Sequence, residues 1–145
     1  MVTSLEQLDE LYREIILDHY KKPRNRAVPP AANVKVEGTN PLCGDEVTLE
    51  MQVDGGFVRD IGLQGKGCSI SLSSGSMMTE AIKGKAVAEA AALLESFKEM
   101  MRGHEPESDL GDLATLAGVR KFPVRVKCAL LAWTTLEQGL KGHKP

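Results

Sequence analysis

The chain has few aromatic residues, few cysteines and almost no net charge. Of its 145 residues, 4% are aromatic and 3 are cysteine, and the formal net charge at pH 7 is −2. A strongly basic surface of the kind that binds nucleic acid is therefore not expected. The longest apolar-looking stretch, AVAEAAALL, holds Glu89 and falls well short of the roughly 20 residues that span a membrane. We expect neither a nucleic-acid nor a membrane partner.

The remaining composition is that of an ordinary globular protein. Hydrophobic residues make up 42% of the chain and charged residues 26%, which suits a single domain over residues 1–145 with its own core. The opening MVTSLEQLDELY is acidic and amphipathic, without the layout of a signal peptide. We therefore expect the protein in the cytoplasm, where thiols stay reduced and an odd number of cysteines forms no disulfide framework.

Hydrophobic spacing divides the chain into helices and a small central sheet. Apolar residues recur at helical intervals in four segments, and the acidic stretch between the third and fourth has room for a short helix. The predicted helices cover residues 4–20, 70–83, 87–101 and 123–140. Between the first two, residues 34–36, 47–53 and 57–63 alternate as strands, with a turn at Asp54-Gly55-Gly56 and a loop over 64–68. The predicted fold class is α+β, with helices packed on one side of an antiparallel sheet.

Each cysteine lies at the boundary of a predicted element. Cys43 is in a glycine- and proline-flanked loop before a strand, Cys68 lies in a glycine-rich loop before a helix, and Cys128 is in the first turns of the last helix. On a helical wheel Cys128 falls about 200° from Val126, opposite the apolar stripe. A cysteine that only packs should share that stripe, so Cys128 is expected to face elsewhere unless another element covers it.

The chemistry of these positions favours reactive or metal-binding thiols. A helix N-terminus stabilises a thiolate, and Arg125 and Lys127 flank Cys128 and act in the same direction. Three thiolates together with the carboxylate of Asp45 would make a tetrahedral set suited to Zn²⁺. The chain has no Cys-x-x-Cys pair, however, so three buried structural cysteines explain the spacing equally well.

Other polar residues carry weaker signals. His19 fits a surface or packing position at a helix end, and His104 and His143 lie in a loose connection and a tail. A basic cluster follows the first helix, and it suits either a solvated face or a patch for a partner. The cluster consists of Lys21, Lys22, Arg24 and Arg26.

Four stretches, in this order, resemble the IscU/NifU-N-terminal family of iron–sulfur cluster assembly scaffolds, and most closely its SufU branch. They are DHYKKPRN, NPLCGDEVTL, GKGCSISLSSGSMMTEAIKGK and FPVRVKCALLAW. The resemblance favours a metal and sulfur site over structural cysteines. It implies a three-stranded antiparallel sheet with helices on one side and a metal site at one end. The implied ligands are Cys43, Asp45, Cys68 and Cys128.

Two departures separate the chain from IscU-type proteins. Lys127 stands where those proteins have a histidine before the third cysteine, which makes Asp45 the expected fourth ligand. KFPVRVK replaces the Leu-Pro-Pro-Val-Lys motif for a dedicated chaperone. The long interval between Cys68 and Cys128 is similar to the insertion of the SufU branch, whose members bind zinc and accept persulfide sulfur from a SufS-type cysteine desulfurase.

The resulting hypothesis is a zinc-dependent sulfurtransferase for iron–sulfur cluster biogenesis, acting with that desulfurase and with downstream assembly proteins. Whether the chain is an enzyme in its own right stays open. Cys43 is the expected sulfur-accepting nucleophile because its loop is accessible, while a helix holds Cys128. One alternative is a scaffold that assembles and transfers a nascent iron–sulfur cluster on the same thiols. The second alternative is a structural zinc protein that binds a partner.

Overall fold

The structure is a computed structural model that describes residues 10–105 and 109–141. In chain order its elements are α1 (Glu10–Lys21), β1 (Val34–Asn40), β2 (Asp45–Asp54), β3 (Phe57–Lys66), α2 (Ser69–Ile82), α3 (Val87–Met101), the 3₁₀ helix η2 (Gly111–Lys121) and α4 (Pro123–Lys141). The four predicted α-helices are confirmed, although residues 4–9 of the first lie outside the described part. None of the described helices is both long and apolar enough to cross a bilayer.

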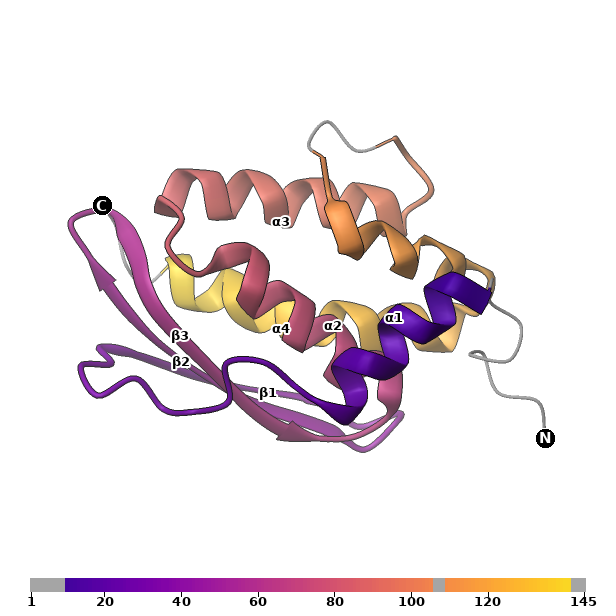
Figure 1. Ribbon diagram of the computed structural model, residues 1–145, viewed down its shortest axis with the longest axis horizontal. Coiled ribbons are helices and arrows are strands. Elements are labelled where there is room, and N and C mark those ends of the chain that lie inside the picture. Colours follow the sequence, from indigo (N-terminus) through magenta and orange to yellow (C-terminus); the bar gives the residue numbers. More distant parts are fainter. Residues whose placement is uncertain (1–9, 106–108, 142–145) are drawn as a thin grey trace.

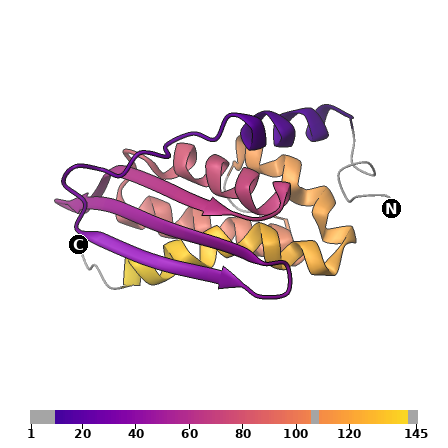
Figure 2. The same ribbon diagram turned by 90° about the horizontal axis from the view of Figure 1, so that it is seen from below.

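The three strands form one antiparallel sheet in the order β1-β2-β3. Along β2, alternate side chains are buried, as the sequence pattern predicts, and they include Val47, Leu49 and Met51. All helices lie on the same side of this sheet, with α2 and α4 against it (Figures 1 and 2). The predicted α+β arrangement with helices on one side is therefore confirmed.

Strand β3 is longer than the sequence indicates. The stretch 64–68 was expected to be a loop, but β3 continues to Lys66, which pairs with Glu46, while Gly65 pairs with Val47. Glycine has no side chain, so the alternation of apolar and polar residues cannot reveal a strand at Gly65, although the backbone pairing with β2 continues there. A Cβ on Gly65 would also overlap the carbonyl oxygen of Glu46. The extension places the segment before Cys68 directly beside the start of β2.

Helix α2 joins the sheet to α4 through buried hydroxyl groups. Ser74 Oγ donates to the carbonyl oxygen of Ala129 at 2.6 Å and accepts from Trp133 Nε1 at 3.1 Å. The Trp133 ring stacks on Phe97 of α3 with ring centroids 4.5 Å apart. Because Ser74 Oγ has both a donor and an acceptor as partners, this polar residue of α2 can lie in the core. This packing fixes α4, and with it Cys128, relative to the sheet.

The acidic connection after α3 holds the short helix that the sequence allowed, but as an eleven-residue 3₁₀ helix, η2. Its buried residues Leu113, Leu116 and Val119 recur every third position. A 3₁₀ helix has three residues per turn, so this spacing puts all three on one face. The apolar face of η2 thereby joins the core beside α4 and α1.

Candidate metal site

Four segments meet at one end of the sheet. Residues 41–44 form the turn between β1 and β2 and carry Cys43, and Asp45 is the first residue of β2. Cys68 is the N-cap of α2, and Cys128 lies in the second turn of α4. The expectation that each cysteine occupies an element boundary is confirmed. The β-hairpin and the two helix starts thus bring together side chains that are far apart in the sequence.

Three of the four predicted ligands form a tight group. One ligand atom each from Cys43, Asp45 and Cys128 lies within 4.8 Å of the other two. The Sγ atoms of Cys43 and Cys128 are 3.0 Å apart. Asp45 and Cys128 are buried, with exposed fractions of 1% and 0%, whereas Cys43 is half-buried. Two thiols and a carboxylate at this spacing suit a thiophilic divalent cation such as Zn²⁺.

Cys68 lies beside this group but turns toward its own helix. Its Sγ accepts a hydrogen bond from the backbone N–H of Ser71 at 3.4 Å, which caps α2. Its backbone N–H donates to Asp45 Oδ1 at 2.9 Å, and its Sγ lies 4.0 Å from Asp45 Oδ2. Asp45 therefore links Cys68 to the other two thiols.

Because Gly67 has no side chain, the carboxylate of Asp45 can pack directly against its backbone. A Cβ at this position would collide with the Asp45 carboxylate, and the φ of Gly67 is +149°, which disfavours other residues. The sequence analysis did not single out Gly67. Its position in a glycine-rich stretch immediately before Cys68 could have indicated this role. Glycines in such stretches often mark a close approach of another group to the backbone.

The expectation that Cys128 is a stabilised thiolate is wrong for the protein without metal. Burial raises the pKa of Cys128 well above its usual range, and the neighbouring Cys43, Asp45 and Cys68 add to the shift. The helix N-terminus does not outweigh burial among other acidic groups. Crowded acidic groups of this kind gain stability when a dication enters, so the donor set fits a metal.

Of the two flanking cations, Arg125 faces the thiols and Lys127 does not. Partial burial tends to lower the pKa of Arg125, but its hydrogen bond to Cys128 and the nearby charges of all three cysteines raise it overall. Lys127 is exposed. Arg125 is therefore the cation placed to offset negative charge at this site.

Asn40 is a polar residue of the site that the sequence analysis missed. It is the last residue of β1 and only 7% exposed. Its Nδ2 donates toward Cys128 Sγ at 3.7 Å. Cys128 shares one face of α4 with the buried Leu131, Thr135 and Gly139, and this face packs against β1. The expectation that Cys128 faces away from packed residues is therefore not met, because the sheet covers the face on which the helical wheel places it.

An open hollow of about 560 Å³ adjoins Cys43. Leu42 and Val124 line it and are 68% and 57% exposed, although both are apolar. Lys121 and Arg125 give its wall a positive charge. The half-buried thiol of Cys43 is therefore the one that a large molecule reaches from this hollow.

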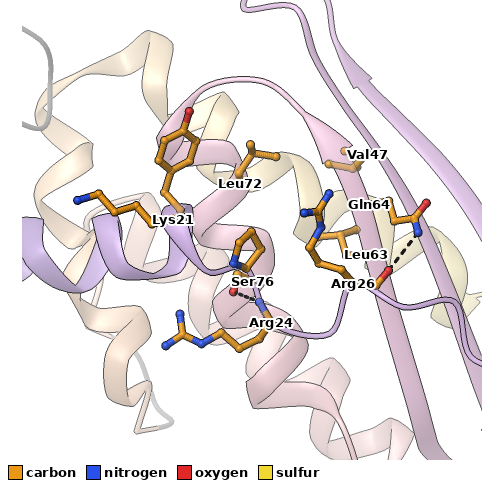
Figure 3. Close-up of a pocket in the computed structure, with 11 residues that line it drawn as sticks. Lys21, Arg24, Arg26, Val47, Leu63, Gln64, Leu72 and Ser76 are labelled. Carbon is orange, nitrogen blue, oxygen red and sulfur yellow. Dashed lines mark hydrogen bonds between the residues drawn. The ribbon is translucent and has the colours of Figure 1, made fainter.

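The basic cluster after α1 has both structural and free members. Arg24 pairs with Asp18 at 2.6 Å and lies 3.7 Å from Glu80. Within residues 10–105 and 109–141, Lys21 and Arg26 have no ion pair. Both line a hollow of about 350 Å³ that is also lined by apolar side chains (Figure 3). Arg24 is thus a structural residue, while Lys21 and Arg26 form a solvated face.

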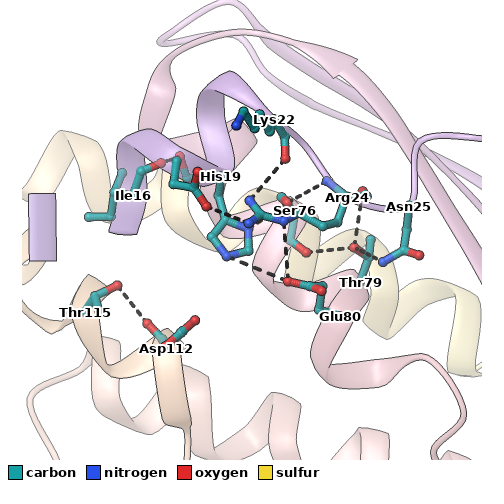
Figure 4. A network of polar contacts seen from close by, with 12 residues as sticks. Ile16, His19, Lys22, Arg24, Asn25, Ser76, Thr79, Glu80, Asp112 and Thr115 are labelled. Carbon is teal, nitrogen blue, oxygen red and sulfur yellow. Dashed lines mark hydrogen bonds and ion pairs between the residues drawn. The ribbon is translucent and has the colours of Figure 1, made fainter. Parts of the chain in front are cut away.

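His19 is a packing residue, one of the two roles expected for it. It is 3% exposed, and its Nδ1 lies 2.8 Å from Ser76 Oγ (Figure 4). Burial is the main cause that lowers the pKa of His19, and the charge of Arg24 adds to it. His104 is exposed beside Glu99, and His143 lies outside the described residues. Neither His19 nor His104 belongs to the group of Cys43, Asp45 and Cys128.

Comparison with known proteins is consistent with this site. The profile of the NifU-like N terminal domain matches residues 11–142. The chain belongs to this family. It is 50% identical over 135 residues to a protein of Bacillus subtilis named zinc-dependent sulfurtransferase SufU, covering 92% of this chain and 91% of that protein.

Two further relatives carry scaffold names. The chain is 41% identical over 140 residues to the iron-sulfur cluster assembly scaffold protein IscU of Streptococcus pyogenes, covering 95% of this chain and 87% of that protein. A crystal structure from Fervidobacterium islandicum, described as a putative iron-sulfur cluster assembly scaffold protein for the SUF system, superposes with a TM-score of 0.83 at 38% identity. The match covers 88% of this chain and 94% of that one. Family and fold therefore agree with the motifs in the sequence.

Proposed function

We propose that this protein is a zinc-dependent sulfur acceptor in iron–sulfur cluster assembly and that it works in the cytoplasm. The observation that carries the proposal is the meeting of Cys43, Asp45 and Cys128 at one end of the sheet, with Cys68 beside them. The B. subtilis relative, named a zinc-dependent sulfurtransferase, supports it. Cys43, Asp45, Cys68 and Cys128 are the proposed ligands. When bound, zinc would hold these thiols as thiolates at neutral pH without redox chemistry of its own.

Cys43 is the proposed nucleophile. Its thiol is half-buried and borders the open hollow, whereas Cys128 is fully buried. The proposed sulfur donor is a persulfide on the cysteine of a SufS-type desulfurase. The Cys43 thiolate attacks the outer sulfur, the S–S bond of the donor breaks, and the donor cysteine leaves as a thiolate. Cys43 ends as a persulfide, and neither an oxidant nor a reductant is consumed.

The surrounding residues prepare this step. Arg125 faces the thiols and offsets their negative charge. Asp45 is buried, and its Oδ1 is held by the backbone N–H of Cys68, which leaves Oδ2 directed toward the sulfur atoms. Exposed Leu42 and Val124 offer the donor enzyme an apolar surface next to Cys43. Large exposed apolar residues beside a reactive group commonly mark a protein contact.

The decisive experiment is cysteine desulfurase turnover with limiting reductant, in the presence and absence of the zinc-loaded protein. We expect a large rise in turnover that the Cys43→Ala variant abolishes, while zinc binding by that variant is weakened rather than lost. A similar rise with Cys43→Ala would rule out Cys43 as the acceptor. No rise, with the two proteins still bound to each other, would turn the assignment toward cluster assembly.

A second candidate function is supported by the scaffold name of the S. pyogenes relative. In that function the same thiols carry a nascent iron–sulfur cluster as cargo, since thiolates bind iron–sulfur clusters as well as zinc. Anaerobic reconstitution followed by transfer of an intact cluster to an apo-protein tests it. Stoichiometric cluster transfer without desulfurase activation would favour the scaffold over the sulfur acceptor.

A further inference from the structure

The three thiols differ in the N–H donors that face them. Cys68 Sγ accepts from the backbone N–H of Ser71 at 3.4 Å. Cys128 Sγ accepts from Asn40 Nδ2 at 3.7 Å, and the Arg125 guanidinium lies close enough to raise its own pKa through Cys128. Within the described residues, the only hydrogen-bond partner of Cys43 Sγ is the thiol of Cys128, at 3.0 Å. The thiol with no N–H donor among the described residues is therefore the one that borders the open hollow.

We propose that Asn40 is a positioning residue that directs sulfur attack to Cys43 by donating an N–H hydrogen bond to Cys128. This inference rests on the proposed role of these thiols in sulfur acceptance. A hydrogen bond to a thiolate stabilises its charge, and the nucleophilicity of a thiolate falls as its charge is stabilised. Cys128 Sγ lies 3.0 Å from Cys43 Sγ and is fully buried, so the donor from Asn40 adds an electronic difference to the difference in access. The donor from Asn40 makes Cys128 the weaker nucleophile of the pair.

Asn40 acts on the two cysteines through different groups. Its main-chain carbonyl oxygen accepts from the N–H of Cys43 at 3.2 Å and closes the turn. In the β1–β2 register it lies opposite Asp45. Its side chain reaches Cys128 instead. A side-chain substitution therefore removes the donor to Cys128 while the backbone contact that shapes the Cys43 turn is kept.

The test compares Asn40→Leu, which keeps the side-chain size without a donor, with Asn33→Leu as the matched control. The Asn33 amide hydrogen-bonds the backbone of Val53 at 2.8 and 2.9 Å, and those bonds tie the residue before β1 to β2 rather than facing a thiol. Each protein is loaded with Co²⁺, whose thiolate charge-transfer absorption reports electron density on sulfur. We expect a shift to longer wavelength in Asn40→Leu and none in Asn33→Leu. An unshifted band in Asn40→Leu would overturn the proposal.

The second measurement maps persulfide by peptide mass spectrometry after reaction with desulfurase and cysteine. We expect persulfide on Cys43 in the unaltered protein and a several-fold larger share on Cys128 in Asn40→Leu. Persulfide confined to Cys43 in both proteins would refute the directing role. Asn40→Asp, which keeps the shape and lacks the N–H, serves if the leucine variant does not fold. Absence of persulfide from every cysteine of the unaltered protein would refute the proposed function, and the Co²⁺ band would still decide the Asn40 contact.

Discussion

Helix α2 borders two buried polar clusters of different character. At its start, Asp45 and the three thiols crowd together, and burial and the acidic neighbours raise the pKa of Cys128. On its flank under α1, His19 and the backbone N–H of Arg24 both bond to Ser76 Oγ, at 2.8 and 2.9 Å (Figure 4). The first cluster sets four acidic groups against the Arg125 guanidinium, and the second is internally paired.

This difference separates groups kept for binding from groups kept for folding. Among the described residues, the one buried side-chain oxygen or nitrogen without a hydrogen-bond partner is Ser71 Oγ, in the first turn of α2 next to Cys68. Buried polar groups without partners cost free energy, and they are retained where a ligand supplies what is missing. The thiol cluster should therefore respond strongly to metal, and the His19 cluster should not.

The largest expected effect is that of metal on the thiol cluster. At a free zinc concentration a thousand times its dissociation constant, binding raises the free energy of unfolding by about 4 kcal/mol. Asp45→Ala should lose most of this stabilisation, because it removes a ligand and the acceptor for the Cys68 N–H. Thermal unfolding with zinc and with chelator measures it. Equal zinc affinity in Asp45→Ala and the unaltered protein would remove Asp45 from the ligand set.

A smaller effect, independent of metal, is expected at the His19 cluster. His19→Ala leaves a cavity and strips Ser76 of one partner, which should cost about 2–3 kcal/mol of unfolding free energy. The loss should be the same with zinc and with chelator, as measured by denaturant unfolding. If chelator changed the size of the loss, the two clusters would be coupled and the contrast between them would fail.

The His19 cluster should also make stability depend on pH. Because the pKa of His19 is lowered on folding, the unfolded chain binds a proton that the folded protein resists. Stability is complete above the ordinary histidine pKa of about 6.5 and falls as the pH drops below it, by at most about 1.4 kcal/mol per pH unit. Asp18, Glu80 and Asp112 oppose the shift, while Arg24 reinforces it. His19→Gln should flatten the slope of unfolding free energy between pH 6.5 and 5.

The smallest effect distinguishes the two cations before Cys128. Arg125→Gln should weaken zinc binding about fivefold, equivalent to about 1 kcal/mol, because four anionic ligands around one dication leave net negative charge for Arg125 to offset. Lys127→Gln should leave zinc affinity unchanged, since Lys127 is exposed. Competition with a chromophoric chelator measures both affinities. Equal losses would mean that only the overall charge of the helix start matters.

The sequence by itself determined the elements and the acidic donors of the site. Apolar periodicity located the helices, alternation located β2, and the motifs around Cys43, Cys68 and Cys128 predicted the family to which the chain belongs. These features are local, and hydrophobic spacing or a short motif encodes them directly. The pattern failed at the C-terminal ends of two strands, because β1 continues beyond the predicted 34–36 to Asn40 and β3 beyond 57–63 to Lys66.

The tertiary structure alone decided how the site is poised. The contact of Asn40 with Cys128 spans 88 positions of sequence, and no local pattern records it. The requirement for glycine at position 67 is equally non-local, because a side chain there would collide with the carboxylate of Asp45. The raised pKa of Cys128 comes first from burial in the core, and helix position alone predicts the opposite direction. Burial and proximity are properties of packing, and they set the chemistry of residues that the sequence could only name.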